Sequence, residues 1–242
     1  MHGEDAVATF LIAHGAWSGG WSWKKIRQRL RERGHEVFTP TYTGLGERAH
    51  LARPEFGLET HVQDVLGVLE YEDLSDVILL GHSYGGMVAT VAADRAPQRI
   101  RRLVYLDAFA PRDGEALEDI AGPEGRARHQ AQLEAQGDGW RTAPSPPSPD
   151  TSAEDLAWSR PRRAPLAIKA FLEPAKLTGA VDRLPKTYIY CTQARPGDGF
   201  RPFAERAKKE GWQYFEIDAT HSPNISAPDA LMEILEQIAA TS

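Results

Sequence analysis

One serine of this sequence stands in a setting that can turn it into a nucleophile. Ser83 lies in the turn Gly81–Gly85 (GHSYG), directly after a short apolar run and directly before a segment with helical periodicity. That context is the one a Gly-x-Ser-x-Gly nucleophile turn requires. The sharp turn exposes the serine hydroxyl, and the two glycines remove side chains that would collide there. An ordinary turn that happens to contain serine explains this agreement less well.

A serine hydroxyl becomes a good nucleophile only when a base takes its proton. His221 follows the last predicted strand, which ends at Ile217, and this is where the fold built on such a serine turn carries its histidine. His14 and His82 flank the motifs, and we expect them to tune the site or to satisfy local hydrogen bonds. We expect the other histidines to be structural or exposed: His2, His35, His50, His61 and His129.

The base needs a carboxylate that holds its tautomer and stabilises the imidazolium. Asp107 lies at the tip of the strand after the serine turn, and Asp198 lies in a later loop, within Arg195–Gly199 (RPGDG). Asp107 could instead cap the following segment, and Asp198 could be a turn residue beside glycine. These positions alone leave both candidates open.

Two backbone N–H groups are candidates for an oxyanion hole. One belongs to Tyr84, the residue after the nucleophile. We expect the other in the loop His14–Trp17 (HGAW), at Ala16. Such donors each stabilise a transition state by about 3 kcal/mol. The loop could also be a plain turn, because Gly15 alone does not distinguish the two.

Strands and helices alternate around these residues. Short apolar runs separate segments of helical periodicity, which predicts βαβ units and an α/β fold: a mostly parallel sheet with helices on both faces. The expected strands are Ala6–Ala13, Glu36–Thr41, Asp76–Leu80, Arg102–Leu106, Thr187–Thr192 and Trp212–Ile217. The expected helices are Gly20–Arg33, Leu58–Leu69, one after the serine turn, Phe203–Glu210 and Pro228–Ala239.

The alternation stops in a Pro- and charge-rich stretch that contains Pro144–Pro149 (PSPPSP). A long insertion between two core strands is typical of a functional cap or lid. Helical pieces are expected within it at Glu124–Gln136 and Ala164–Leu172. We therefore expect a core of residues 1–110 and 186–242 and an inserted helical cap of residues 111–185.

Bulk properties narrow the class of protein. A chain of 242 residues suits one domain, and its net charge of -6 gives no basic footprint for nucleic acid. No apolar run is long enough to span a membrane. The single cysteine, Cys191, excludes an intramolecular disulfide, and the N-terminus lacks signal-peptide features, so we expect a cytoplasmic protein. The oligomeric state stays open, a homodimer included.

Several motifs together resemble the plant methylesterase and hydroxynitrile lyase group of α/β-hydrolase-fold enzymes. They are Phe10–Trp17 (FLIAHGAW), Gly19–Trp23 (GGWSW), Gly34–Val37 (GHEV) and Gly81–Met87 (GHSYGGM). Two further stretches look more like bacterial arylesterase-type relatives: Thr43–Arg48 (TGLGER) and Tyr105–Phe109 (YLDAF). The resemblance covers the core and is weak across the cap. It implies a Ser-His-Asp hydrolase that acts on small esters, without metal or cofactor.

The chain departs from the plant pattern at the acid. The plant enzymes carry an aspartate after Cys-Thr-x, where this chain has Ala194, and a small apolar residue where it has Asp107. Some enzymes of this fold place the acid at the earlier strand tip. We therefore favour Asp107 over Asp198 as the acid.

A second departure concerns the reaction. Lyases of the group carry threonine where this chain has Gly15, and lysine where it has Ser222, so plant-type cyanide chemistry is disfavoured. The expected reaction is hydrolysis of a small aryl, alkyl or methyl ester, or of a lactone, through an acyl-enzyme. Two alternatives stay open: a cofactor-free lyase or oxygenase that uses a His–Asp pair, and a non-catalytic small-molecule receptor.

Aromatic and histidine side chains are the candidates for the substrate pocket. They are His14, Trp17, His82, Trp140, Trp158 and Phe171. A partly apolar pocket would suit small aryl or alkyl groups. The aromatic residues of the cap could equally serve only to pack it onto the core.

Overall fold

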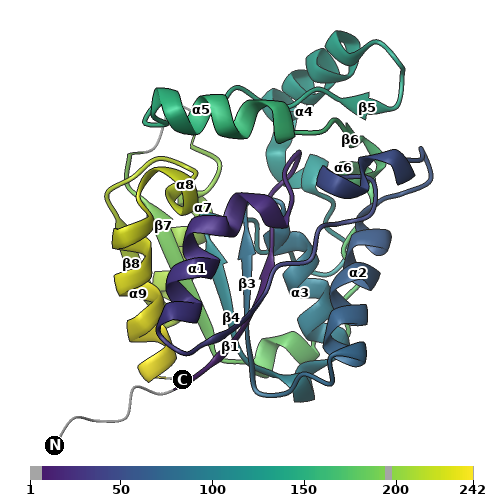
Figure 1. The fold of residues 1–242 in the computed structure, drawn as a ribbon. Coiled ribbons are helices and arrows are strands. Elements are labelled where there is room, and N and C mark those ends of the chain that lie inside the picture. Colours follow the sequence, from purple (N-terminus) through teal and green to yellow (C-terminus); the bar gives the residue numbers. More distant parts are fainter. Residues whose placement is uncertain (1–6, 194–197, 242) are drawn as a thin grey trace, which may run out of the picture.

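The computed structural model of the protein describes residues 7–193 and 198–241. In this part of the chain, six parallel strands form a central sheet in the order β2-β1-β3-β4-β7-β8 (Figure 1). The strands of this sheet are β1 Thr9–Ala13, β2 Glu36–Phe38, β3 Val77–His82, β4 Ile100–Leu106, β7 Lys186–Cys191 and β8 Gln213–Ile217. The predicted fold class is therefore confirmed.

Helices cover both faces of this sheet (Figure 1). They are α1 Lys24–Glu32, α2 Leu58–Tyr71, α3 Gly85–Arg95, α7 Arg201–Lys209, α8 Pro223–Ser226 and α9 Pro228–Ala240. Side chains alternate between the faces along each strand. Phe10 and Ile12 of β1 pack with α1 and α9, whereas Leu11 packs with α2 and α3. All of β3 is buried, as expected of a central parallel strand.

Two predicted elements near the N-terminus need correction. The predicted helix Gly20–Arg33 is a 3-10 turn, Gly20–Trp23, followed by α1. The predicted strand Glu36–Thr41 ends at Phe38. It ends there because the next residues bind the first loop instead of the sheet: the Gly20 N–H donates to Thr41 Oγ1 at 2.8 Å. The predicted start of the first strand, Ala6, lies outside the described residues.

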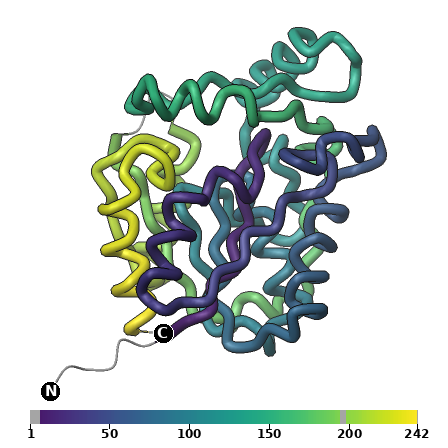
Figure 2. Tube along the Cα trace, in the orientation of Figure 1, coloured from purple at the N-terminus to yellow at the C-terminus, as the bar shows by residue number. Residues whose placement is uncertain are grey.

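Most of residues 111–185, which we call the cap segment, lies across the carboxyl ends of the strands (Figures 1 and 2). The segment contains α4 Leu117–Gln136, β5 Arg141–Thr142, α5 Ala153–Ser159, β6 Leu166–Ala167 and α6 Lys169–Leu172. β5 and β6 pair as a short antiparallel ribbon. Its last part returns to the core, where Val181 N donates to Asp94 of α3 at 3.0 Å.

The prediction of helices in the cap segment was partly wrong. Ala164–Leu172 was expected to be one helix, but Leu166 and Ala167 pair with β5 and leave α6 with Lys169–Leu172. The helix α5 was not predicted. Ser152 starts α5, because its Oγ accepts a hydrogen bond from the Asp155 N–H at 3.1 Å.

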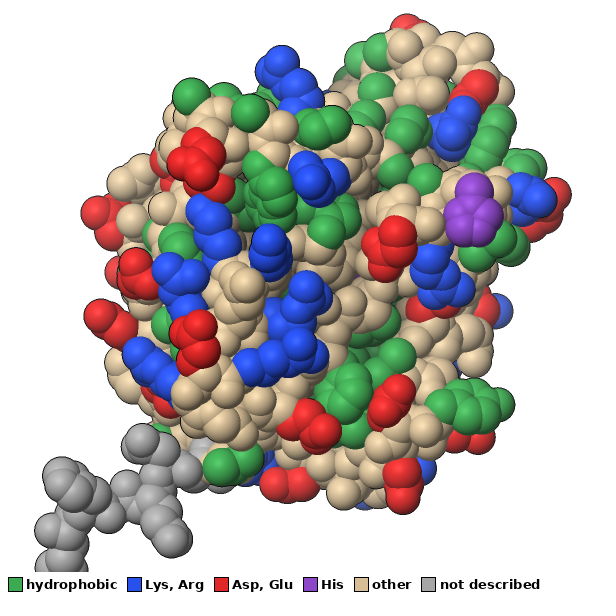
Figure 3. Space-filling model, in the orientation of Figure 1, with side chains coloured by type: hydrophobic (Ala, Val, Ile, Leu, Met, Phe, Trp, Pro, Cys, Tyr) green, Lys and Arg blue, Asp and Glu red, His purple; other side chains and the backbone are tan. Residues whose placement is uncertain are grey.

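Charges of both signs lie over α1 at the surface (Figure 3). Lys25 pairs with Asp155 at 2.7 Å, and Arg29 pairs with Asp229 at 2.8 Å.

Within residues 7–193 and 198–241, no helix has the length and apolar character needed to cross a bilayer.

Candidate active site

The turn at Ser83 is a strained connection between β3 and α3. Ser83 has a φ of 56°, in the left-handed region that side chains rarely adopt. The chain also passes so close to β1 that a Cβ on Gly85 would lie 2.1 Å from the Ala13 carbonyl oxygen. A Cβ on Gly81 would lie 2.6 Å from the Gly85 oxygen. Glycine is therefore required at both positions, and the turn projects the serine above the sheet.

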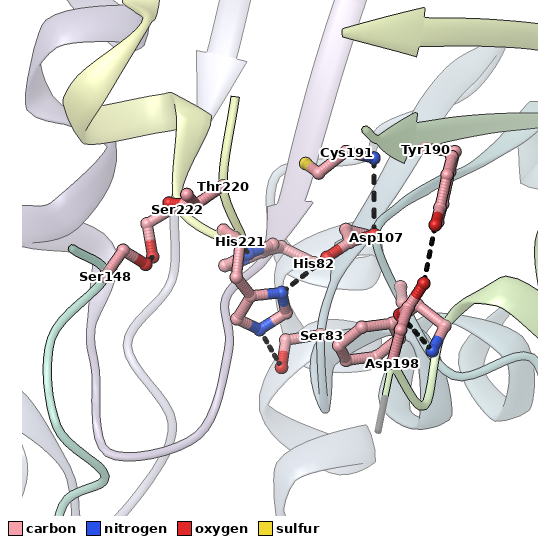
Figure 4. Close-up of polar contacts among 12 residues, drawn as sticks. His82, Ser83, Asp107, Ser148, Tyr190, Cys191, Asp198, Thr220, His221 and Ser222 are labelled. Carbon is pink, nitrogen blue, oxygen red and sulfur yellow. Dashed lines mark hydrogen bonds and ion pairs between the residues drawn. The ribbon is translucent and has the colours of Figure 1, made fainter. Parts of the chain in front are cut away.

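His221 connects Ser83 to a buried carboxylate (Figure 4). Its Nε2 lies 2.9 Å from Ser83 Oγ, and its Nδ1 lies 2.7 Å from Asp107 Oδ2. With the proton on Nδ1, the ring donates to the carboxylate and turns the Nε2 lone pair toward the serine hydroxyl. The His221 side chain is 37% exposed and that of Asp107 is 6% exposed. This arrangement can remove the serine proton while the carboxylate faces the developing imidazolium.

Asp107 is fixed between the neighbouring strands β4 and β7. Its N–H donates to the Ile189 oxygen at 2.8 Å, and its Oδ1 accepts from the Cys191 N–H at 3.3 Å. Its φ of 41° is left-handed, like that of Ser83. These bonds leave Oδ2 aimed at His221.

Asp198 has other hydrogen-bond partners than His221. Its Oδ2 accepts a hydrogen bond from the Tyr190 hydroxyl at 2.5 Å, and its Oδ1 accepts from the Phe200 N–H at 2.9 Å. Burial, together with this carboxylate, raises the pKa of Tyr190. No hydrogen bond joins Asp198 to His221 in the described part of the chain. Ala194, where the plant pattern has its acid, lies outside the described residues.

A residue that the sequence did not predict contacts the imidazole. The Phe200 ring stacks on His221 with centroids 4.7 Å apart and planes 11° apart. Phe109 packs against Phe200 at 4.9 Å. An aromatic face favours a neighbouring cation and restricts rotation of the imidazole. No periodicity or motif marks Phe200, because its position depends on the bond from its N–H to Asp198.

The two backbone donors predicted for the oxyanion hole are free of hydrogen bonds to the described residues. Neither the Ala16 N–H nor the Tyr84 N–H donates a hydrogen bond to any described residue. The Tyr84 side chain is buried and points away, because its hydroxyl hydrogen-bonds to Nδ1 of His61 at 2.8 Å. The arrangement therefore offers two N–H groups beside Ser83.

The cap segment holds the loop that carries Ala16. Trp17 has a φ of 57°, and its indole N–H donates to Thr142 O and Oγ1 at 3.1 and 3.0 Å. Its carbonyl accepts from the Ala164 N–H at 3.1 Å, and its ring lies edge-on to Phe171. The loop is thus fixed by β5 and by the residue Ala164, which precedes β6.

His14 and His82, two of the candidate pocket residues, are buried and hydrogen-bonded to the backbone. Nδ1 of His14 donates to the Gly15 oxygen at 2.8 Å, and its Nε2 accepts from the Tyr42 N–H at 3.1 Å. Nε2 of His82 donates to the His221 carbonyl at 2.7 Å. Burial lowers the pKa of His14 to about 4 and that of His82 to about 3, so both are neutral at pH 7.

The predicted pocket aromatics divide into two groups. Phe171 is buried against Trp17 and Tyr84, beside the turn that carries Ser83. Trp158 packs edge-on against Trp21 of the core, and the Arg141 guanidinium lies over the Trp140 ring within the cap segment. Within the described ranges, no group of three or more His, Cys, Asp or Glu residues could hold a metal ion.

Comparisons with known proteins agree with this architecture. A sequence profile described as "Alpha/beta hydrolase family" matches residues 10–234. The chain is 38% identical over 239 residues to a carbendazim hydrolyzing esterase of Nocardioides sp. (strain SG-4G), with 95% of this chain and 98% of the relative covered. It is 25% identical over 257 residues to methyl jasmonate esterase 1 of Vitis vinifera, with 97% and 98% covered.

A solved structure of an alpha/beta-hydrolase has a similar fold. An extracellular alpha/beta-hydrolase from a Paenibacillus species superposes with a TM-score of 0.81 at 27% identity, covering 95% of this chain and 98% of that one. It is described as sharing structural and functional homology with the tobacco Salicylic Acid Binding Protein 2. The predicted resemblance to plant methylesterases and their bacterial relatives is confirmed, and the chain belongs to the alpha/beta hydrolase family.

Proposed function

We propose that this protein hydrolyses small carboxylic esters through an acyl-enzyme on Ser83, with His221 as the base and Asp107 as the acid. The observation that carries the proposal is the continuous hydrogen-bonded chain from Ser83 Oγ through His221 to Asp107, at 2.9 and 2.7 Å. The esterase relative at 38% identity supports the same reaction class.

Each residue has a defined part in the two half-reactions. His221 takes the Ser83 proton as Oγ attacks the ester carbonyl, and the N–H groups of Ala16 and Tyr84 stabilise the resulting oxyanion. The C–O bond to the alcohol then breaks, and the alcohol leaves with the proton that His221 returns. A water molecule, deprotonated by His221, attacks the acyl-enzyme, and Ser83 recovers its proton as the acid is released.

The surroundings of Ser83 suit an uncharged acyl group. Trp17, Phe109 and Phe200 are half-buried, and each lies next to, or contacts, a member of the proposed machinery. We propose that these rings and the cap segment select small aryl, alkyl or methyl esters, or lactones. Carbendazim is a further candidate substrate, because the Nocardioides relative is named for hydrolysing it.

A panel of small esters and lactones, with carbendazim, tests the proposal. We expect turnover by the wild-type protein and a loss of about 10⁶-fold in kcat in Ser83→Ala, since the serine and its base act as a unit. Ser75→Ala, at an exposed loop serine, serves as the matched control and keeps full activity. Turnover retained in Ser83→Ala would refute the nucleophile.

The same His221–Asp107 pair also suits a second reaction class. A cofactor-free lyase or oxygenase would use the pair as a base while Ser83 only donates a hydrogen bond. A serine-directed phosphonate separates the two: covalent trapping of Ser83 and a burst of product support the hydrolase. Activity without either supports the second class, and ligand binding without turnover indicates a receptor.

A further inference from the structure

A loop of the cap segment is hydrogen-bonded to the residues on both sides of His221. Asp150 accepts from the Thr220 N–H at 3.1 Å and from the Ser226 hydroxyl at 2.8 Å, and the Thr220 hydroxyl also donates to it. Ser148 donates to the Ser222 hydroxyl at 3.3 Å (Figure 4). The cap therefore contacts Thr220, directly before His221, and also Ser222 and Ser226, which follow it.

These contacts matter because His221 lies in neither a strand nor a helix. It follows β8 by a few residues, and α8 begins two residues later. From the core side, Nε2 of His82 donates to the His221 carbonyl at 2.7 Å. From the cap side, Asp150 holds Thr220. The backbone of the base is thus fixed between one anchor in the core and one in the cap.

Asp150 is suited to holding the His221 loop because it is a charged acceptor. Burial alone would raise its pKa, but the hydrogen bonds from Thr220 and Ser226 hold the pKa below its usual range. Bonds to an ionised acceptor are shorter and stronger than those between neutral groups. The carboxylate can therefore hold three donors of the His221 loop at once.

A second tie reaches the same loop from α5. The Lys25 ammonium pairs with Asp155 at 2.7 Å and donates to the Ile225 carbonyl at 3.0 Å. Ile225 belongs to α8, directly after the bend that carries His221. Two separate acidic residues of the cap thus reach the same loop, one directly and one through Lys25.

We propose that Asp150 is a positioning residue for the base: it fixes Thr220 and Ser226, and through them it orients His221 between Ser83 and Asp107. The inference rests on the proposed catalytic role of His221. It gives the cap segment a part in assembling the catalytic geometry, in addition to any part in selecting substrates. A displacement of about 1 Å in such geometry can cost roughly 10²-fold in rate.

The test compares two cap aspartates of similar chemistry. Asp138 accepts from the N–H groups of Trp140 and Arg141 and pairs with Arg141, so these partners all lie within the cap. We expect Asp150→Ala to lower kcat by about 10- to 100-fold with KM within about threefold, and Asp138→Ala to match wild type. Equal kcat values for the two variants would overturn the proposal.

A gentler variant keeps the test valid if Asp150→Ala folds poorly. Thr220→Val removes one hydroxyl donor but keeps the side-chain shape and the N–H bond to Asp150. We expect a smaller loss of kcat than in Asp150→Ala, and a double variant no worse than Asp150→Ala alone. Fully additive losses would mean that the two residues act separately, and would contradict the proposal.

A spectroscopic measurement separates this inference from the proposed function. The Nδ1 proton of His221, shared with Asp107, should give a far-downfield NMR resonance without any substrate present. We expect this resonance to broaden or shift in Asp150→Ala and to stay unchanged in Asp138→Ala. An unchanged resonance in Asp150→Ala overturns the positioning role even if the protein is an esterase. Turnover retained in Ser83→Ala would instead refute the proposed function alone.

Discussion

At the residue scale, the two aspartates that the sequence offers as the acid have different partners. Asp107 bonds to His221 and to the Cys191 N–H, which ties the strand tips β4 and β7 to the base. Asp198 bonds to Tyr190 and to the Phe200 N–H, which sets the ring that stacks on His221. Asp107 therefore orients the His221 imidazole through its edge. Asp198 positions Phe200, whose ring packs on the face of that imidazole.

This division predicts unequal effects of two matched substitutions. Asp107→Asn should lower kcat by about 10³- to 10⁴-fold, because an amide in place of Oδ2 favours the wrong tautomer of His221. Asp198→Asn keeps an acceptor for the Phe200 N–H and should change kcat by less than about tenfold. Steady-state kinetics on an activated aryl ester measures both. A larger loss in Asp198→Asn would reverse the assignment of the acid.

The sequence predicted part of this site for clear physical reasons. Ser83 and His221 are tied to strand ends, and strand ends can be located from apolar runs. The choice between Asp107 and Asp198 depends on which loop meets the β8–α8 connection in space, and no spacing encodes that. Phe200 and Asp150 were missed for the same reason, since their roles come from loop conformation rather than from a motif.

At the element scale, the ribbon of β5 and β6 fixes the loop that follows β1. Trp17 donates its indole N–H to Thr142, whereas no described residue accepts a hydrogen bond from the buried Trp21 indole N–H. Both tryptophans also pack edge-on against an aromatic ring of the cap. The two side chains therefore have similar packing and differ in whether the indole N–H donates a hydrogen bond.

Trp17→Phe should lower the free energy of unfolding by about 1 kcal/mol more than Trp21→Phe does, since only Trp17 loses a hydrogen bond. It should also lower kcat severalfold, because the Ala16 N–H lies on the loop that Trp17 holds. Denaturant unfolding and ester kinetics on both variants measure these effects. Equal losses in the two variants would show that the bond to Thr142 contributes little.

The sheet could be predicted more completely than the cap, for reasons that particular elements illustrate. Buried strands such as β3 are continuous apolar runs, so their positions were predicted to within a few residues. In the cap, Leu166 and Ala167 look helical by composition, and only their pairing with β5 makes them a strand. α5 had a detectable signal, because Ser152 and Asp155 have N-cap spacing.

At the scale of the whole molecule, buried neutral histidines link stability to pH. Burial lowers the pKa of His14 to about 4 and those of His61 and His82 to about 3, whereas an unfolded chain would hold each near 6.5. Below about pH 6.5, the unfolded state therefore binds protons that the folded state does not. Stability must fall as the pH drops from this value toward about 4.

Thermal unfolding between about pH 7.5 and 4.5 should show this fall, and His61→Gln should make it shallower by removing one of the three groups. His50→Gln, at an exposed histidine, should leave the slope unchanged. Identical slopes in the two variants would mean that His61 titrates normally in the folded protein.

The hydrogen bonds from the cap to the loops of Trp17 and His221 also limit how the cap of this chain can be exchanged. A chimera that takes residues 111–185 from a relative with other side chains at positions 150 and 142 would lose the bonds from these side chains to Thr220 and Trp17. Positions 142 and 17, and likewise positions 150 and 220, therefore form compatible pairs that have to be exchanged together. For an engineer who wants a new substrate range, the transferable module is the cap together with these two loops.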